Sequence, residues 1–190
     1  NGWNPIANND DYGNGGHGTN CLGMIGAKGN NGSLVVGANW DVKLMVVKNQ
    51  GTQEAQVIKA YDFPLTQRKD YNTTSGAKGA FVVAVNSSWG IDNANPASYP
   101  LWCAFYNEMG AAGIINTGAT ANANTNVDVA GDMPTGCNSD YLLTVTNIWR
   151  NDQKVTQAGY GLTTIDMGAF GQDAYTVSDT DPTGFDDFGG

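Results

Sequence analysis

The sequence has few of the residues that define several common classes of protein. Its 190 residues include one histidine, three cysteines and nine lysines or arginines, against 18 aspartates and glutamates. The resulting net charge of -9 disfavours a phosphate backbone or an anionic membrane surface as a partner. We therefore expect no nucleic-acid partner.

Membrane-spanning, zinc-binding and disulfide-rich classes are also disfavoured. The chain has no run of about 18 apolar residues, the length needed to span a bilayer, so we expect no membrane span. One histidine without closely spaced cysteines supplies too few ligands for a zinc site. Three cysteines allow at most one internal disulfide, which is too few for a disulfide-rich scaffold.

The chain does contain enough apolar material for one sizeable core. Hydrophobic residues make up 41% of the sequence, so a single globular domain is expected. The few lysines and the many asparagines, glycines and threonines are typical of secreted proteins. The sequence begins Asn1-Gly2-Trp3 rather than with a methionine, and we expect it to be processed or cut from a longer chain.

Apolar runs of strand length alternate with segments that have helical features. Helices are predicted over residues 19–28, 52–63 and 100–113, and strands over residues 42–48, 80–90, 113–120, 140–148 and 163–171. Pro64 is expected to end the second helix and Pro100 to begin the third. Because continuous apolar strands that alternate with helices favour a parallel sheet covered on both faces, we predict an α/β domain.

Polar residues follow several of the predicted strands. In a sheet of this kind, reactive residues lie on the loops outside the carboxyl ends of the strands. The stretch NSSWG (residues 86–90), Asn122 and the region of Asp140 lie near strand ends. Taken singly, each is most simply a polar turn residue, and a lone histidine such as His17 is more often structural than catalytic.

The order of these motifs resembles that of the subtilases, the subtilisin family of serine proteases. HGTNCLGMIGA (17–27) resembles the stretch around the family's catalytic histidine, and VVAVNSSWG (82–90) its substrate-binding strand. GIINTGATANANTNVD (113–128) resembles the strand that ends in the oxyanion asparagine, while DYLLTVTNI (140–148) and AGYGLTTIDMGAFG (158–171) resemble the strands before the nucleophile motif. The resemblance covers nearly the whole chain. It implies the family's three-layer α/β sandwich, with a mostly parallel central sheet and helices on both faces.

The resemblance also implies roles for individual residues. His17 corresponds to the general base that takes the serine proton and returns it to the leaving amine, and Asn122 to the asparagine whose amide stabilises the oxyanion. The residues that match the edge pairing with an extended polypeptide substrate are Ser88, Trp89 and Gly90. The residues that match one wall of the main specificity pocket are Ala119, Thr120 and Ala121, and their small size indicates an open, apolar preference.

Two members of the family's triad are not found. Its aspartate usually lies about thirty residues before the histidine, whereas only 16 residues precede His17, and we interpret Asp10 and Asp11 as ordinary loop acids. The nucleophile motif Gly-Thr-Ser does not occur, and Phe170 stands where the family usually has proline. We therefore expect residues 1–190 to be one segment of a catalytic domain, truncated at both ends, inactive alone and completed by other pieces of that domain.

Two further functions are considered beside that of a secreted serine endopeptidase. A non-catalytic, subtilase-derived binding or adhesive domain would also lack the serine. An unrelated α/β carbohydrate-binding domain, rich in tryptophan and asparagine, would make the ordered motifs a coincidence. The coding sequence on either side of this segment separates the first two, because an enzyme needs the missing aspartate and serine motifs.

The resemblance finally bears on the cysteines and on calcium. Cys21 lies at a position that carries a cysteine in one branch of the family, which implies a buried free thiol beneath His17 and leaves Cys103 and Cys137 to form a disulfide. No cofactor is required. A structural calcium ion is implied at the loop 28–34 with Asn30 as a ligand, while the other ligands would be backbone carbonyls. We interpret the acidic residues near the end of the chain as solvated; they are Asp179, Asp181, Asp186 and Asp187.

Overall fold

A computed structural model describes residues 2–13, 16–33, 35–49, 51–181 and 183–189. The chain forms two compact units. The first unit consists of the described residues of 1–48 and 171–190, and the second of those of 49–170.

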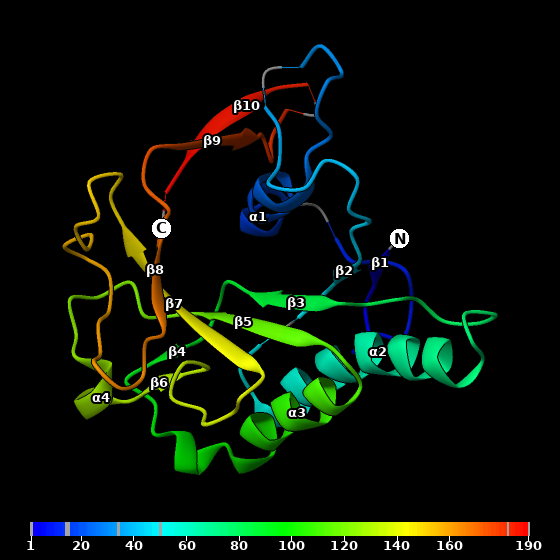
Figure 1. The fold of residues 1–190 in the computed structure, drawn as a ribbon, viewed down its shortest axis with the longest axis horizontal. Coiled ribbons are helices and arrows are strands. Elements are labelled where there is room, and N and C mark those ends of the chain that lie inside the picture. The colour runs from blue at the N-terminus through cyan, green and yellow to red at the C-terminus, as the bar shows by residue number, and fades with distance from the viewer. Residues whose placement is uncertain (1, 14–15, 34, 50, 182, 190) are drawn as a thin grey trace. The chain divides into compact units, whose positions relative to one another are not determined.

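The second unit is built on a sheet of four parallel strands. These are β3 (Ala84–Ser87), β5 (Ile115–Ala119), β7 (Leu142–Ile148) and β8 (Met167–Phe170), hydrogen-bonded in the order β3-β5-β7-β8 (Figure 1). Every neighbouring pair is parallel. The predicted α/β class with a parallel central sheet is therefore confirmed, although each strand is shorter than the apolar run that predicted it.

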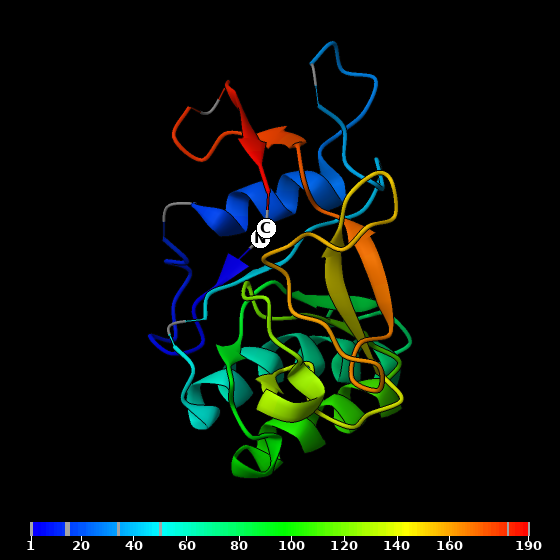
Figure 2. The same ribbon diagram turned by 90° about the vertical axis from the view of Figure 1, so that its left-hand side faces the viewer.

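Helices α2 (Glu54–Thr73) and α3 (Pro100–Ala111) lie on the same side of this sheet (Figures 1 and 2). Pro100 begins α3, as expected, because its fixed φ suits the first turn and its missing N–H would have no partner there. The core lies between the helices and the sheet. Its members include Val57, Tyr61, Leu65, Trp102, Tyr106, Met109, Ile114, Met133 and Leu142. Burying a side chain of this size stabilises the fold by about 1.5–3 kcal/mol.

Helix α2 does not end at Pro64, which corrects the prediction from the sequence. The helix continues to Thr73 with Pro64 inside it. A proline removes one helical hydrogen bond and usually ends or kinks a helix. Here Pro64 and Leu65 are buried on the face that also carries Val57 and Tyr61. Packing of that face against the core offsets the lost hydrogen bond, and this contact is not visible in the local sequence.

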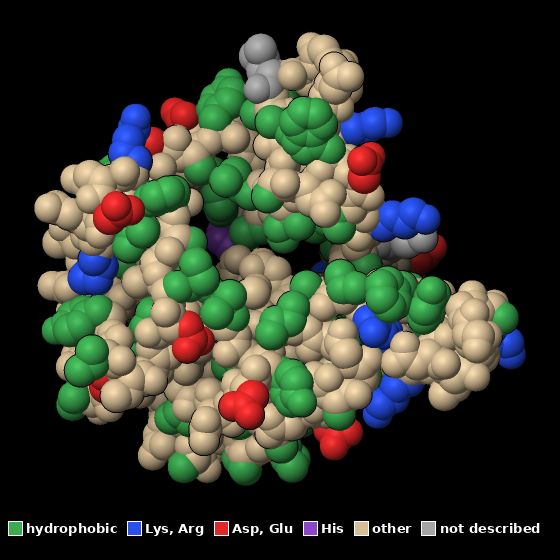
Figure 3. Space-filling model, viewed as in Figure 1, with side chains coloured by type: hydrophobic (Ala, Val, Ile, Leu, Met, Phe, Trp, Pro, Cys, Tyr) green, Lys and Arg blue, Asp and Glu red, His purple; other side chains and the backbone are tan. Residues whose placement is uncertain are grey.

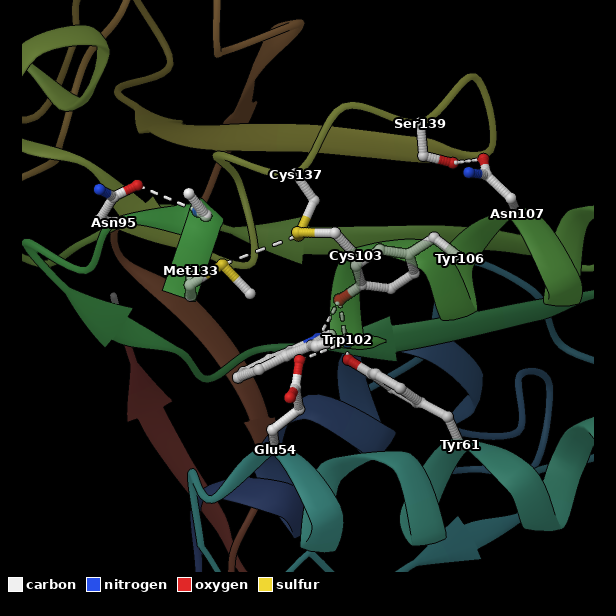
Figure 4. The surroundings of a disulfide bond; sticks show 11 residues. Glu54, Tyr61, Asn95, Trp102, Cys103, Tyr106, Asn107, Met133, Cys137 and Ser139 are labelled. Carbon is white, nitrogen blue, oxygen red and sulfur yellow. Dashed lines mark hydrogen bonds between the residues drawn. A yellow bond between two sulfur atoms is a disulfide. The ribbon is translucent and has the colours of Figure 1, made fainter. Parts of the chain in front are cut away.

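A disulfide and a chain of hydrogen bonds join the elements of this core (Figure 4). Cys103 on α3 is bonded to Cys137, 34 residues later, so the predicted pairing is confirmed. Trp102 Nε1 donates to the Tyr106 hydroxyl at 2.9 Å, and the Tyr106 and Tyr61 hydroxyls are 2.9 Å apart. Burial raises the pKa of Tyr106 well above its usual value, so this hydroxyl keeps its proton.

Four short elements complete the second unit. Strand β4 (Ile91–Asp92) pairs antiparallel with β6 (Asp132–Met133), so that Ile91 faces Met133 and Asp92 faces Asp132. Between β4 and α3 lies a 3-10 turn (Pro96–Ser98). Helix α4 (Val127–Ala130) precedes β6 and is capped by the side chain of Asn126.

The first unit has one helix and two pairs of short strands. Strand β1 (Gly2–Trp3) runs parallel to β2 (Val46–Val47). Of the strand predicted over residues 42–48, only these two residues of β2 form a strand. Strands β9 (Ala174–Val177) and β10 (Phe185–Phe188) form an antiparallel pair. Helix α1 (His17–Gly26) begins two residues before the predicted start at residue 19.

The described residues contain no helix that is long and apolar enough to cross a bilayer. Acidic and basic side chains are interspersed over the face seen in Figure 3. The expected absence of a nucleic-acid partner remains a prediction from the net charge.

Candidate functional site

His17 is the first residue of helix α1. The preceding Gly16 has φ 76°, a left-handed conformation that glycine adopts without strain, and it lets the chain turn sharply into the helix. The imidazole is exposed. Cys21, one turn later, has its Sγ 3.7 Å from His17 Nδ1, and the Phe188 ring lies edge-on at 5.3 Å between centroids.

Helix α1 is fixed against strand β9. Asn20 Nδ2 donates to the carbonyl of Val177 at 2.9 Å, and the Thr176 hydroxyl donates to the carbonyl of Asn20 at 3.0 Å. A Cβ at Gly23 would lie 2.3 Å from Thr176 Oγ1, so only glycine allows this approach. The helix therefore holds His17 at its start while leaving the ring accessible.

The described residues supply no carboxylate hydrogen bond to His17. Asp11 accepts hydrogen bonds within its own loop, from the backbone N–H of Gly13 at 3.1 Å. This contact agrees with the interpretation of Asp11 as a loop acid. In a triad, the orienting acid holds the imidazole in one tautomer. None of the described residues does this for His17.

Two candidate substrate-binding segments lie at one edge of the sheet in the second unit. Residues 88–90 follow β3, and residues 119–122 end and follow β5. Strands β3 and β5 are parallel, with Ser87 facing Gly118, so both segments leave the sheet at its carboxyl edge. The structure thus brings together the residues that the sequence assigned to the substrate edge, the pocket wall and the oxyanion donor.

The side chain of Trp89 packs against the core. Its ring stacks on Tyr61 at 6.2 Å and lies 5.3 Å from the ring of Trp102, measured between centroids. Ser87, the last residue of β3, is buried and has its hydroxyl 2.7 Å from that of Tyr61. These contacts fix the segment 88–90, and its backbone is the part that remains to pair with an extended peptide.

Asn122 is exposed, and its side-chain amide has no hydrogen-bond partner among the described residues. The loop that carries it is held at several points. Thr120 donates its backbone N–H to the carbonyl of Val145 at 3.0 Å, and Ala121, which is buried, accepts from the N–H of Gly159 at 2.8 Å. An available amide on an anchored loop is what an oxyanion donor requires.

Asp132 was not identified from the sequence, but the structure places it behind this loop. It is 1% exposed. Its carboxylate accepts hydrogen bonds from the hydroxyls of Thr120, at 3.2 Å, and Thr135. Burial raises the pKa of Asp132 to about 6, as does the charge of Asp92, while the hydrogen bonds of Thr135, Thr120 and the Ala121 backbone oppose the rise. The only signal in the sequence is an acid between Gly131 and Met133, which does not reveal its burial.

The remaining predicted positions lie in the first unit. Cys21 is outside the disulfide, and it is half-buried rather than buried as expected, because it lies on α1 one turn from the exposed His17. Asn30 is exposed and has φ 55°, while Leu34, the last residue of the predicted calcium loop, lies outside the described residues. Lys28 lines a pocket that this loop forms with residues 177 and 183–185, and the described residues hold no group of three histidine, cysteine, aspartate or glutamate side chains that could bind a metal ion. The ligands expected for calcium at this loop are the Asn30 side chain and backbone carbonyls, and this site stays a prediction.

His17 and Asn122 belong to different units, so their approach to one another stays a prediction. Solved structures support the fold as a whole. A cold-adapted subtilisin-like serine proteinase is 16% identical with a TM-score of 0.69, covering 99% of this chain and 60% of its own. The epidermin leader peptide processing protease of Staphylococcus aureus is 16% identical with a TM-score of 0.68, covering 91% and 49%. The nisin leader peptidase of Lactococcus lactis is 15% identical with a TM-score of 0.67, covering 92% and 58%.

The chain thus spans 60% or less of the length of these three proteins. No curated protein matches it in sequence. The sequence model of the subtilase family matches residues 1–185, nearly the whole chain, in agreement with the parallel sheet and the motifs at its carboxyl edge. The chain belongs to the subtilase family.

Proposed function

We propose that the chain is the central part of the catalytic domain of a secreted serine endopeptidase that hydrolyses peptide bonds with a serine, histidine and aspartate triad. The observation that carries this proposal is the family match together with the exposed amide of Asn122, which stands on an anchored loop beside the segment 88–90. The disulfide between Cys103 and Cys137 supports a secreted location, because disulfides persist in oxidising compartments.

In this proposal each part of the chain has a defined task. The backbone of residues 88–90 pairs with an extended polypeptide, and Ala119, Thr120 and Ala121 form one wall of the pocket for the substrate side chain. His17 takes the proton of the nucleophilic serine and returns it to the leaving amine. The Asn122 amide donates to the oxygen that becomes negative at the tetrahedral stage. The serine and the aspartate would come from other parts of the same catalytic domain.

The test uses the full-length protein that carries this chain, with casein as an unstructured substrate and a fluorophosphonate as a serine-directed label. His17→Ala is expected to abolish both reactions, since the serine then has no base. Asn122→Ala is expected to lower kcat by about a hundredfold to a thousandfold, as expected for loss of one oxyanion donor.

A matched control is Asn138→Ala. Asn138 is also exposed but precedes β7, so it lies at the amino end of that strand rather than at the carboxyl edge. Equal activity of the Asn122→Ala and Asn138→Ala proteins would contradict the assignment of the oxyanion donor. The 190-residue chain alone should not be labelled, and labelling at Ser88 or Ser178 would refute the proposal.

The alternative is a non-catalytic binding domain that retains the peptide-binding edge. It uses the segment 88–90 at the carboxyl ends of the parallel strands and needs no serine nucleophile. A full-length protein that binds an extended peptide through residues 88–90 but lacks fluorophosphonate labelling would establish this alternative.

A further inference from the structure

Asp132 is a buried carboxylate that the proposed reaction does not use. Its carboxylate is 1% exposed and carries no ion pair to a lysine or arginine in the described part of the chain. A charge in such surroundings is unfavourable unless several donors compensate it. Two donors do so here: the hydroxyls of Thr120 and Thr135, which both contact Asp132 Oδ2.

One of these two donors, Thr120, belongs to the loop that precedes Asn122. Thr120 lies two residues before the candidate oxyanion donor, and its hydroxyl is tied to the Asp132 carboxylate. The other donor, Thr135, lies three residues after Asp132 and is also buried. One carboxylate therefore connects the loop at the end of β5 to the turn that follows β6.

Strand β6 also contacts the other candidate substrate-binding segment. Ile91, directly after Gly90, faces Met133 in the β4 and β6 pair. A Cβ at Gly90 would lie 1.9 Å from the carbonyl oxygen of Met133, so the two backbones are in direct contact. The segment 88–90 and the loop 120–122 thus share β6 as a common support.

We propose that Asp132 is a positioning residue, whose carboxylate holds the loop 120–122 so that the Asn122 amide is kept in place beside the segment 88–90. The geometric part concerns this chain alone, while its consequence for turnover rests on the proposed function. Protonation of Asp132 removes its charge and adds an O–H donor, so the two hydrogen bonds that Thr120 and Thr135 donate to Oδ2 must weaken or rearrange. Asp92, its partner in the strand register, is the titratable group whose charge acts on Asp132.

The first experiment measures the backbone amide signals of Ala121 and Asn122 by NMR in the 190-residue chain as the pH is varied. In the wild type both signals are expected to shift with a midpoint near the pKa of Asp132, about 6. Asp132→Asn, which keeps the shape but cannot ionise, is expected to abolish this shift. The His17→Gln chain is expected to retain it, which excludes the imidazole as its source.

Two threonine variants form a matched pair. Thr120→Val and Thr135→Val each remove one hydroxyl from the same carboxylate and keep the side-chain shape. Only Thr120→Val is expected to move the Asn122 signals at neutral pH, because only Thr120 belongs to the loop. Equal shifts of Asn122 in both variants, or a pH response that persists in Asp132→Asn, would overturn the proposal.

The second experiment measures kinetics in the full-length protein. Asp132→Ala is expected to lower kcat by about tenfold to a hundredfold with little change in KM, because a displaced donor affects the transition state more than substrate binding. Asp132→Asn is expected to recover part of that loss at neutral pH. An unchanged kcat in a folded Asp132→Ala enzyme would overturn the positioning role. If the NMR coupling is found but the full-length protein has no hydrolytic activity, the proposed function fails and the geometric part stands.

Discussion

The two units hold their candidate site residues in different ways. In the second unit, the loop that carries Asn122 is attached to a core with large buried aromatic side chains. In the first unit, the helix that begins with His17 is held by close contact at a glycine and by hydrogen bonds of Asn20. Every member of the buried hydrophobic cluster lies in the second unit. The candidate oxyanion side of the site therefore depends on core burial. The candidate base depends on the close approach of α1 to β9.

The largest effect is expected from the core of the second unit. Trp102 is fully buried and shares hydrogen bonds or ring contacts with Tyr106 and Trp89. Trp102→Ala should lower the free energy of unfolding by about 3–5 kcal/mol, as measured by chemical denaturation. The control is Trp40→Ala in the first unit, where the side chain is 54% exposed and a small change is expected. Similar losses of unfolding free energy in both variants would contradict the conclusion that the large buried core lies in the second unit.

The disulfide should contribute somewhat less than the buried tryptophan. Replacing Cys103 and Cys137 together by serine removes a link across 34 residues, which should lower the free energy of unfolding by about 2–4 kcal/mol. Cys21→Ser, in the first unit, is the control. Alkylation without reductant, followed by intact-mass analysis, should label Cys21 alone. Labelling of Cys103 or Cys137 would show that the pairing is wrong.

A smaller effect is expected at the glycine contact of the first unit. Gly23→Ala places a methyl group 2.3 Å from Thr176 Oγ1 and 2.6 Å from Val177 Cγ2, so α1 must shift from β9. The expected loss is about 1–3 kcal/mol in the free energy of unfolding. Gly18→Ala in the same helix is the matched control, because no atom lies within 4 Å of the new methyl group. It should be neutral or stabilising by up to about 1 kcal/mol, and a loss as large as that of Gly23→Ala would refute the packing argument.

The smallest effects concern one exposed aspartate in each unit. Hydrogen bonds with Thr164, Thr163 and Leu162 lower the pKa of Asp128 to about 2, and those of Thr183 lower the pKa of Asp181. Because both pKa values are depressed in the folded chain, their stabilisation is present above the ordinary value of 3.8 and is lost as the pH falls below it.

Thermal unfolding at neutral pH and at about pH 2 checks this sign. Asp128→Asn and Asp181→Asn should each lower Tm at neutral pH, and the difference from the wild type should narrow in acid. The effect of Asp128→Asn should be the larger, because its carboxylate accepts N–H groups from three successive residues. A difference that widens in acid would contradict the assigned direction.

The elements that the sequence predicts well are those marked by an apolar run or by a proline at a helix start. The strands ending near Ser87 and Ala119 were located this way, and their parallel register then places the two substrate-binding segments together. The course of α2 past Pro64 was missed because its compensation comes from tertiary packing. Asp132 was missed for the same reason, since its donors Thr120 and Thr135 surround it only after the chain has folded.

The hydrogen exchange of the Trp102 indole N–H reports how often the core of the second unit opens. The indole proton is held by the Tyr106 hydroxyl in a side chain with no exposed surface, so solvent reaches it only when the surrounding core opens. In deuterated water its exchange should therefore follow the rarest and most extensive opening events rather than local fraying. The exchange rate of this one proton would then report how often the core that supports the segment 88–90 opens.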